Sequence, residues 1–283
     1  MATDFKKMVT LSNQVLLIVD ALNLAFRWKH MGAKDFVEDY IAVVKSLQKS
    51  YKAGTVVIAC DKGSSSYRKA LHPGYKQGRK DKQALQTPEE EQAFFDFLDE
   101  FNRAIEEISK IFTVFRFDGV EADDISSYIV TQYADDFDQV WLISSDRDWD
   151  LLVTPKVSRF SYVTRKEITY DNWSEHYEYP CEDHISIKCL TGDTGDSIPG
   201  VPGIGPKTAQ KLVCQYGSTY DIIANLPITG KYKYIANLNT FGADALMLNY
   251  RLMDLVSYCD EALGEENCES IRIKMDEVLS RSK

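Results

Sequence analysis

The chain has 283 residues, 44% of them hydrophobic, and a formal net charge of −10 at pH 7. This length and composition predict one or two domains around a large core. They exclude a disulfide frame, because the six cysteines are dispersed without a CxxC pair, and a transmembrane helix, because no apolar run approaches about 20 residues.

Residues 1–14 contain no secretory signal, and the cysteines fit a reduced, cytoplasmic protein. Cys181 and His184 could form half of a soft-metal site, but no second pair has suitable spacing, so zinc is not expected. The negative charge does not exclude nucleic acid, because residues 62–82 carry seven basic side chains against one acidic side chain.

Two apolar runs, 15–19 and 55–60, have the composition of buried parallel strands. A segment with helical spacing of apolar residues, 36–51, lies between them, which predicts a right-handed βαβ unit. Asp20 and Asp61 directly follow the two runs. Sites in open α/β sheets lie beyond the carboxyl ends of the strands, so both aspartates are expected at the functional edge.

Residues 62–86 are basic and rich in glycine and serine, and they include Tyr67, His72 and Tyr75. One interpretation is a solvated, partly helical linker. The other is a flexible basic arm that contacts a phosphate backbone, with Tyr75 free to stack on a base.

A capping box at 87–90 predicts a long scaffold helix with an apolar stripe from Phe94 to Ile108. Strands are predicted at 112–117, 140–144 and 159–164.

Five carboxylates flank the helix and strand that follow residue 119. Glu121, Asp123 and Asp124 open the helix, and Asp146 and Asp148 follow the strand. Packed together, they would repel one another, and a divalent cation such as Mg²⁺ relieves that repulsion. A solvated acidic surface patch is the alternative. Asp150 adjoins Leu151 and Leu152 and is left out of the site.

From about residue 185 the pattern is helical. Asp193 and Asp196 sit in a glycine-rich turn, and residues 200–211 resemble a helix-hairpin-helix, in which Gly203 and Gly205 expose backbone N–H groups to a phosphate. A plain glycine-rich turn between helices is the alternative. Pro206 separates Gly205 from Lys207, so the P-loop pattern fails.

Seven stretches between residue 18 and about residue 210 together resemble the 5′-nuclease (flap endonuclease) family. They are IVDALNLAFR, ACDKG, GYKQGR, GVEADD, ISSDRDWD, TGDTGDSIPG and GVPGIGPKTA. The resemblance is closest to the free-standing bacteriophage 5′-exonucleases, and the chain is also similar to the N-terminal nuclease domain of bacterial DNA polymerase I. No metal position departs clearly from the family pattern.

The resemblance implies an α/β core with a mostly parallel sheet (1–185), a basic helical arch (62–86), and a helical region (186–283) with a helix-three-turn-helix at about 190–220. It implies a two-metal phosphodiesterase that acts as a 5′→3′ exonuclease and flap endonuclease and leaves 5′-phosphate and 3′-hydroxyl ends. Asp61, Glu121, Asp123 and Asp146 would hold one ion, Asp148, Asp193 and Asp196 the second, and Asp20 and Asp124 would act through ordered water. Lys76 would reach the scissile phosphate with support from Arg79. Lys207 and the backbone of residues 203–205 would bind duplex phosphate, and Arg27 is a further DNA-contact candidate.

The implied cofactors are two Mg²⁺ ions, with Mn²⁺ as a substitute and K⁺ at the hairpin. The implied partners are branched, flap or 5′-ended DNA and RNA–DNA primers. The resemblance also implies a monomer that acts in the bacterial cytoplasm, such as that of a phage-infected host. Two alternatives stay open: a phosphatase of the aspartyl-phosphate type, for which the residues after Asp20 lack a second aspartate, and a catalytically silent DNA-structure-binding protein.

Overall fold

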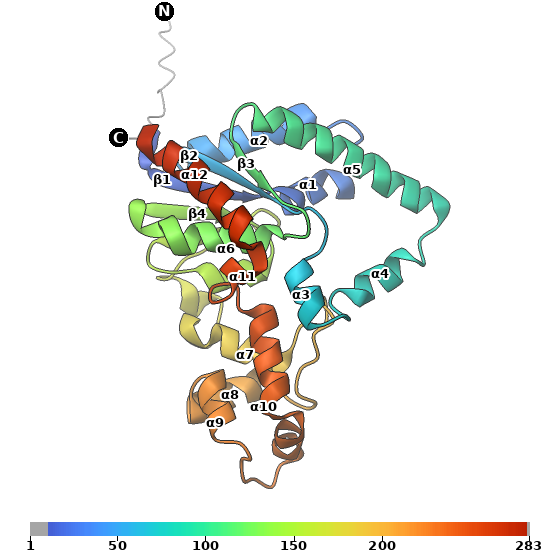
Figure 1. Ribbon diagram of the computed structural model, residues 1–283, viewed down its shortest axis with the longest axis vertical. Helices are drawn as coiled ribbons and strands as arrows, with labels where there is room; N and C mark the ends of the chain where they lie inside the picture. The colour runs from blue at the N-terminus through green and yellow to red at the C-terminus, as the bar shows by residue number, and fades with distance from the viewer. Residues whose placement is uncertain (1–10, 282–283) are drawn as a thin grey trace, which may run out of the picture.

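The computed structural model describes residues 11–281 and builds them around one six-stranded sheet (Figure 1). Its strands are β1 (Ser12–Asp20), β2 (Ala53–Cys60), β3 (Thr113–Arg116), β4 (Gln139–Ile143), β5 (Val157–Ser161) and β6 (Lys166–Ile168). Their order is β3-β2-β1-β4-β5-β6, and every neighbouring pair is parallel except β5 and β6. The predicted mostly parallel sheet is confirmed. Most of the segment in which no secretory signal was found, residues 1–10, lies outside the described residues.

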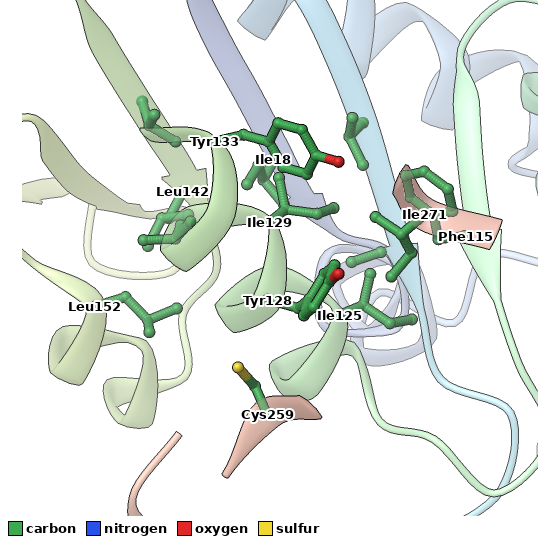
Figure 2. Close-up of a cluster of buried hydrophobic side chains, with 14 of the residues drawn as sticks. Ile18, Phe115, Ile125, Tyr128, Ile129, Tyr133, Leu142, Leu152, Cys259 and Ile271 are labelled. Carbon is green, nitrogen blue, oxygen red and sulfur yellow. The ribbon is translucent and has the colours of Figure 1, made fainter. Parts of the chain in front are cut away.

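Strand β1 is central, and its side chains alternate between two apolar layers because successive residues of a strand point to opposite faces. Leu17 and Val19 pack with α1 (Ala21–His30), α2 (Val37–Ser50) and α5 (Pro88–Ser109). Leu16 and Ile18 pack with α6 (Ala122–Tyr133) on the other face. Figure 2 shows Ile18 among the side chains of this second layer, which include Ile129 of α6 and Ile271 of the last helix.

The scaffold helix begins as predicted. Thr87 Oγ1 accepts from the Glu90 backbone, and Glu90 Oε2 accepts from the Thr87 N–H at 2.9 Å. The buried stripe of α5 includes Phe97, Phe101 and Ile108. Before it, the basic segment forms two short helices, α3 (Ser66–Leu71) and α4 (Gln77–Gln83), and Figure 1 shows α4 leading outward to the far end of α5. The segment is therefore helical and anchored at α3, as the helical-arch interpretation expects.

The second half of the chain is mainly helical. It contains α7 (His184–Thr191), α8 (Pro206–Tyr216), α9 (Thr219–Ala224), α10 (Lys233–Met253), α11 (Cys259–Leu263) and α12 (Glu265–Arg281), with short 3-10 turns at Ala134–Asp136, Arg147–Leu152, Trp173–Glu175 and Cys181–Asp183. Helices α7 to α10 share a core of their own. Helices α11 and α12 instead return to the sheet, where Cys259 and Ile271 join the layer under α6. The predicted division at residue 185 did not anticipate this return and stays a prediction. None of the helices within 11–281 is long and apolar enough to cross a membrane.

The last predicted strand, 159–164, is wrong at its end. β5 stops at Ser161, and the chain turns so that the Arg165 N–H donates to the Ser161 carbonyl at 2.8 Å, with Arg165 in the left-handed region at φ 59°. The turn leads into β6, the antiparallel edge strand that the sequence did not reveal. A three-residue strand is too short to show a periodic pattern.

A buried ion pair ties β5 to the 3-10 turn Arg147–Leu152, which follows β4. Arg159 Nε lies 2.5 Å from Asp150 Oδ1, Arg159 Nη2 lies 2.9 Å from Asp150 Oδ2, and both side chains are almost fully buried. Arg159 Nη1 also donates to the Ser144 carbonyl at 2.9 Å. This pair explains why Asp150, which was left out of the predicted site, faces away from the other carboxylates.

We predict that Asp150→Asn lowers the free energy of unfolding by about 3 kcal/mol or more, because it leaves the Arg159 guanidinium buried without a counter-charge. Urea denaturation measures this loss. The exposed pair of Glu107 and Lys110 provides the control, since Glu107→Gln should cost less than about 1 kcal/mol. Equal losses for the two variants would contradict the prediction.

Candidate active site

Acidic residues follow three neighbouring strands at one edge of the sheet. Asp20 ends β1 and lies in register with Ala59 of β2, so Asp61 follows close beside it. On the other side of β1, β4 ends in register with Val19, and Asp146 follows three residues later. The Ser144 hydroxyl joins the two ends: it donates to Asp20 Oδ2 at 2.7 Å and accepts from the Asp146 N–H at 3.0 Å.

The first turn of α6 adds Glu121 and Asp123 to this edge. Glu121 is the N-cap residue, and Asp61 Oδ1 accepts from the Ala122 N–H at 3.1 Å, so Asp61 binds one of the free N–H groups at the start of the helix. The Trp149 indole donates to Asp123 Oδ1 at 2.6 Å. The turn before the helix requires Gly119, since φ is 69° and an added Cβ would lie 2.1 Å from the Ser66 hydroxyl oxygen.

Asp193 and Asp196 come from a tight loop after α7. Backbone hydrogen bonds of 2.9 and 2.7 Å pair residue 193 with Ile198, and the Asp196 N–H donates to Asp193 Oδ1 at 3.1 Å. Close approach of the loop ends requires Gly200, because an added Cβ would lie 2.0 Å from the Thr191 carbonyl oxygen. The loop thereby turns both carboxylates toward the sheet edge.

These side chains surround a single cavity of about 450 Å³. Eight of the nine predicted carboxylates line it, together with both predicted cationic residues: Asp20, Asp61, Glu121, Asp123, Asp146, Asp148, Asp193, Asp196, Lys76 and Arg79. The chain segments that supply them are up to 176 residues apart in sequence, from Asp20 to Asp196. An acidic patch spread over the solvated surface, the alternative for this stretch, does not fit side chains that line one concave site.

Burial and mutual repulsion raise the pKa of several of these carboxyl groups. Burial is the larger cause for Asp20 and the charge of Asp61 adds to it, so the pKa of Asp20 lies well above its ordinary value. The pKa of Asp123 is likewise raised by burial and then by Asp146. The pKa values of three others, Asp61, Asp146 and Asp196, are raised mainly by burial. Burial also acts on Glu121, but Lys76 and Arg68 outweigh it and lower its pKa.

Cationic side chains compensate part of the negative charge. Lys76 Nζ lies 2.8 Å from Glu121 Oε1 and 3.8 Å from Asp196 Oδ2, and Arg79 Nη2 lies 2.5 Å from Asp196 Oδ1. Lys188 of α7 binds Asp148 and lies 3.6 Å from Asp193 Oδ2. The sequence reading missed Lys188. One sequence feature could have identified it: Lys188 is a single lysine among apolar residues of a short helix, and a charge buried there needs a partner of opposite charge.

No three histidine, cysteine, aspartate or glutamate side chains in the described part of the chain converge closely enough to hold a metal ion as they stand. The carboxylates instead surround the cavity, and the lysine and arginine groups lie between them. The donor set nevertheless suits a hard divalent ion, because it consists only of carboxylate oxygens, and burial followed by like charge raises the pKa of Asp20 and of Asp123. The residues therefore fit divalent metal in chemistry, and side-chain rotation has to bring them around an ion.

Asp124, predicted to act at the metal site through ordered water, does not line the cavity, and its role at the metal site stays a prediction. Its two carboxylate oxygens each accept from the Arg68 guanidinium at 2.8 Å, and both side chains are almost fully buried outside the cavity. Arg68 Nε also donates to the Leu252 carbonyl at 2.9 Å. A guanidinium and a carboxylate match as a two-point pair, and this pair fixes α3 to α6. Arg68 is thus a structural cation within the basic segment.

Tyr75, predicted to be free to stack on a base, is only 2% exposed in this structure, and its stacking on a base stays a prediction. The Tyr75 hydroxyl lies 2.8 Å from Glu121 Oε2 and 3.0 Å from Asp196 Oδ2, and the Lys76 N–H donates to the Asp196 carbonyl at 2.9 Å. Tyr75 therefore holds two cavity carboxylates in place. The adjoining Lys76 has left-handed backbone geometry at φ 57°, which directs its side chain into the cavity.

The other predicted DNA contacts lie outside the cavity. Gly203 has φ 82°, Gly205 is the N-cap of α8, and Lys207 is exposed in its first turn. Lys207 lines a second cavity of about 430 Å³ together with Lys188 and Arg147. The guanidinium of Arg27 lies 4.8 Å from the centre of the Tyr162 ring, beyond the cavity. Their contacts with DNA stay predictions.

Comparison with known proteins agrees with this arrangement. Residues 15–178 match the family described as 5′-3′ exonuclease, N-terminal resolvase-like domain, and residues 179–276 match 5′-3′ exonuclease, C-terminal SAM fold. The chain is 43% identical over 258 residues to the flap endonuclease of Escherichia phage T5, which covers 89% of this chain and 87% of that protein. A crystal structure of the bacteriophage T5 flap endonuclease in a complex with DNA and metal ions is similar, with 40% identity, a TM-score of 0.90, and 94% and 99% of the two chains covered. DNA polymerase I of Bacillus caldotenax is 33% identical over 177 residues, 60% of this chain and 19% of that protein.

We predict that Asp123→Asn stabilises the metal-free protein at pH 8. Asp123 has a raised pKa in the folded state, so its contribution to stability is present at low pH and is lost as pH rises through the folded pKa. An amide keeps the oxygen that accepts from Trp149 and carries no charge. Because each unit of pKa shift corresponds to about 1.4 kcal/mol, the gain should be on the order of 1 kcal/mol or more.

Urea denaturation in EDTA over a series of pH values downward from pH 8 measures this gain, which should shrink as the pH falls and wild-type Asp123 takes up a proton. Asp148→Asn is the control, because it removes an ion-pair partner of Lys188 and should not stabilise the protein. A loss of stability in Asp123→Asn at pH 8 would contradict the prediction, because it would show that the charge of Asp123 does not destabilise the folded protein.

Proposed function

The chain belongs to the 5′-3′ exonuclease family, and on that premise we propose that it is a structure-specific 5′-nuclease. It would act as a 5′→3′ exonuclease and flap endonuclease, hydrolysing phosphodiester bonds near 5′ ends and at junctions of single-stranded and duplex DNA. The resemblance seen in the sequence motifs is confirmed by the family matches. The observation that carries the function is the one cavity that gathers eight carboxylates with Lys76 and Arg79.

The cavity supports binding of two divalent ions. The related flap endonuclease structure holds metal ions, and the oxygen-only donor set here suits Mg²⁺, with Mn²⁺ as a substitute. Asp61, Glu121, Asp123 and Asp146 would hold one ion, and Asp148, Asp193 and Asp196 the other. When bound, the ions would supply Lewis acidity that activates water and stabilises charge on the phosphate and the leaving oxygen.

Lys76 and Lys188 would change partners when the carboxylates are neutralised. In the structure each ammonium group binds two carboxylates of the cavity. Lys76 would then turn toward the phosphoryl oxygens and stabilise the charge that grows on them in the transition state. Arg79, which is largely exposed at the cavity mouth, would bind the same phosphate or its neighbour. Asp20 would orient water, since its oxygens already accept from Asn23 and Ser144.

The elements around the cavity suit a branched nucleic acid. The exposed lysines of α4 would contact a single strand, and the start of α8 with Lys207 would contact duplex phosphates. A K⁺ ion would bind at the turn before α8. DNA is bound in the related structure, and RNA–DNA primers are a further proposed substrate. We also propose that the protein acts as a monomer in the bacterial cytoplasm during replication.

The direct test is cleavage of a 5′-labelled flap duplex with Mg²⁺ or with EDTA. We expect short labelled products near the junction only with Mg²⁺. Intact substrate that is bound but uncut with both Mg²⁺ and Mn²⁺ would favour the silent DNA-binding protein instead.

We predict that Lys76→Ala slows this cleavage at least 100-fold at saturating enzyme, because electrostatic stabilisation of the transition state by one such group contributes on this order. Binding of the flap duplex in Ca²⁺ should weaken only a fewfold. Lys80→Ala is the matched control, since Lys80 is exposed in α4 and does not line the cavity: it should weaken binding of the strand a fewfold and leave cleavage at saturating enzyme unchanged. Equal losses of binding and cleavage in Lys76→Ala would contradict its assigned role.

A further inference from the structure

A groove of about 590 Å³ lies between the end of α1 and the first half of α5. Its lining includes two aromatic rings and two lysines: Phe94, Phe97, Lys29 and Lys34. The sequence reading assigned this part of α5 to the scaffold only. The groove is outside the carboxylate cavity, with which it shares no lining residue.

One face of α1 connects the carboxylate cavity to this groove. Leu22 and Phe26 line the cavity, and Lys29 lines the groove. These three residues are spaced by four and three positions, so they share a helix face. The Phe26 ring, which lines the cavity, stacks on the Phe97 ring, which lines the groove, with 5.5 Å between centroids, so a direct ring contact joins the two linings. A strand that leaves the cavity along α1 would reach the groove.

The lysines of the groove are available to bind an anion, because the acidic residues of the groove have other partners. Lys29 Nζ lies 4.2 Å from the centroid of Phe94, and within residues 11–281 neither Lys29 nor Lys34 forms an ion pair. The two acidic residues that line the groove have other partners: Glu90 accepts from Thr87 in the capping box, and Asp96 accepts from Gln92 at 2.8 Å. A partly buried cation over an aromatic ring, without a carboxylate partner, suits a ligand that combines a flat ring with an anion.

We propose that this groove binds an unpaired nucleotide of the 5′ strand whose scissile phosphate lies in the carboxylate cavity. Its base would stack on Phe94, and its phosphate would meet Lys29. This inference rests on the proposed nuclease function and adds a subsite to it. The seven steps from Leu22 to Lys29 rise about 10 Å along the helix, or about three nucleotides at 3.4 Å each. The groove would therefore select substrates with several unpaired 5′ nucleotides.

The test compares cleavage of a recessed 5′ end, a flap, and flaps in which one abasic nucleotide occupies each unpaired position in turn. Loss of base stacking should lower kcat/KM of the wild-type protein about fivefold or more at one or two adjacent positions, centred about three nucleotides from the cut. Phe94→Ala should lower kcat/KM on the intact flap by a similar factor. It should be insensitive to the abasic position and should cleave the recessed end like wild type.

Two further variants keep the outcome interpretable. Phe95→Ala changes the exposed neighbour, which does not line the groove, and should behave as wild type. Phe94→Leu retains apolar packing without the ring and should reproduce the Phe94→Ala pattern with an unchanged Tm. Equal losses on flap and recessed substrates, or an abasic effect that persists in Phe94→Ala, would overturn the subsite and leave the groove to another ligand such as a protein segment. A wild-type protein that cleaves none of the substrates would refute the nuclease function itself.

Discussion

Repulsion among carboxylates at one sheet edge is the constraint on which the rest of the structure depends. Parallel strands and the start of α6 bring Asp20, Asp61, Asp123 and Asp146 together, where burial and like charge raise their pKa values. The fold compensates with cations from other elements. Lys76 comes from the basic segment and Lys188 from α7, so the same ion pairs that reduce the repulsion also dock these elements against the sheet.

This compensation links stability to function. A protein optimised only for stability would replace several of these carboxylates with neutral groups, since unpaired buried charge is costly. In the proposed function, the retained charges attract divalent cations, and the lysines that pair with the carboxylates in the metal-free state would then be free to contact a phosphate. Tyr75 also contributes to both, because its hydroxyl contacts Glu121 and Asp196 and the next residue in the chain is Lys76, which lines the cavity. Stabilising contacts and proposed catalytic groups are therefore the same side chains.

The sequence predicted the features that local patterns encode. Apolar runs located the central strands, and their topology was enough to bring Asp20, Asp61 and Asp146 to one edge. Pairings between distant residues were beyond this reasoning. Nothing local indicates that Asp124 pairs with Arg68 outside the cavity, that Tyr75 is buried beside the carboxylates, or that α12 returns to cover the sheet. Lys188 was within reach, because an isolated lysine in an apolar helix implies a buried partner.

The most direct measurement is isothermal titration of the protein with Ca²⁺, without DNA, at pH 7 in two buffers with different ionisation enthalpies. If divalent ions replace protons and lysine ammonium groups as the partners of the carboxylates, two ions should bind with net proton release, seen as a heat that depends on the buffer. Asp123→Asn should bind fewer ions and release fewer protons. Binding with buffer-independent heat, or unchanged binding in Asp123→Asn, would contradict the account of the carboxylate cavity as the metal site.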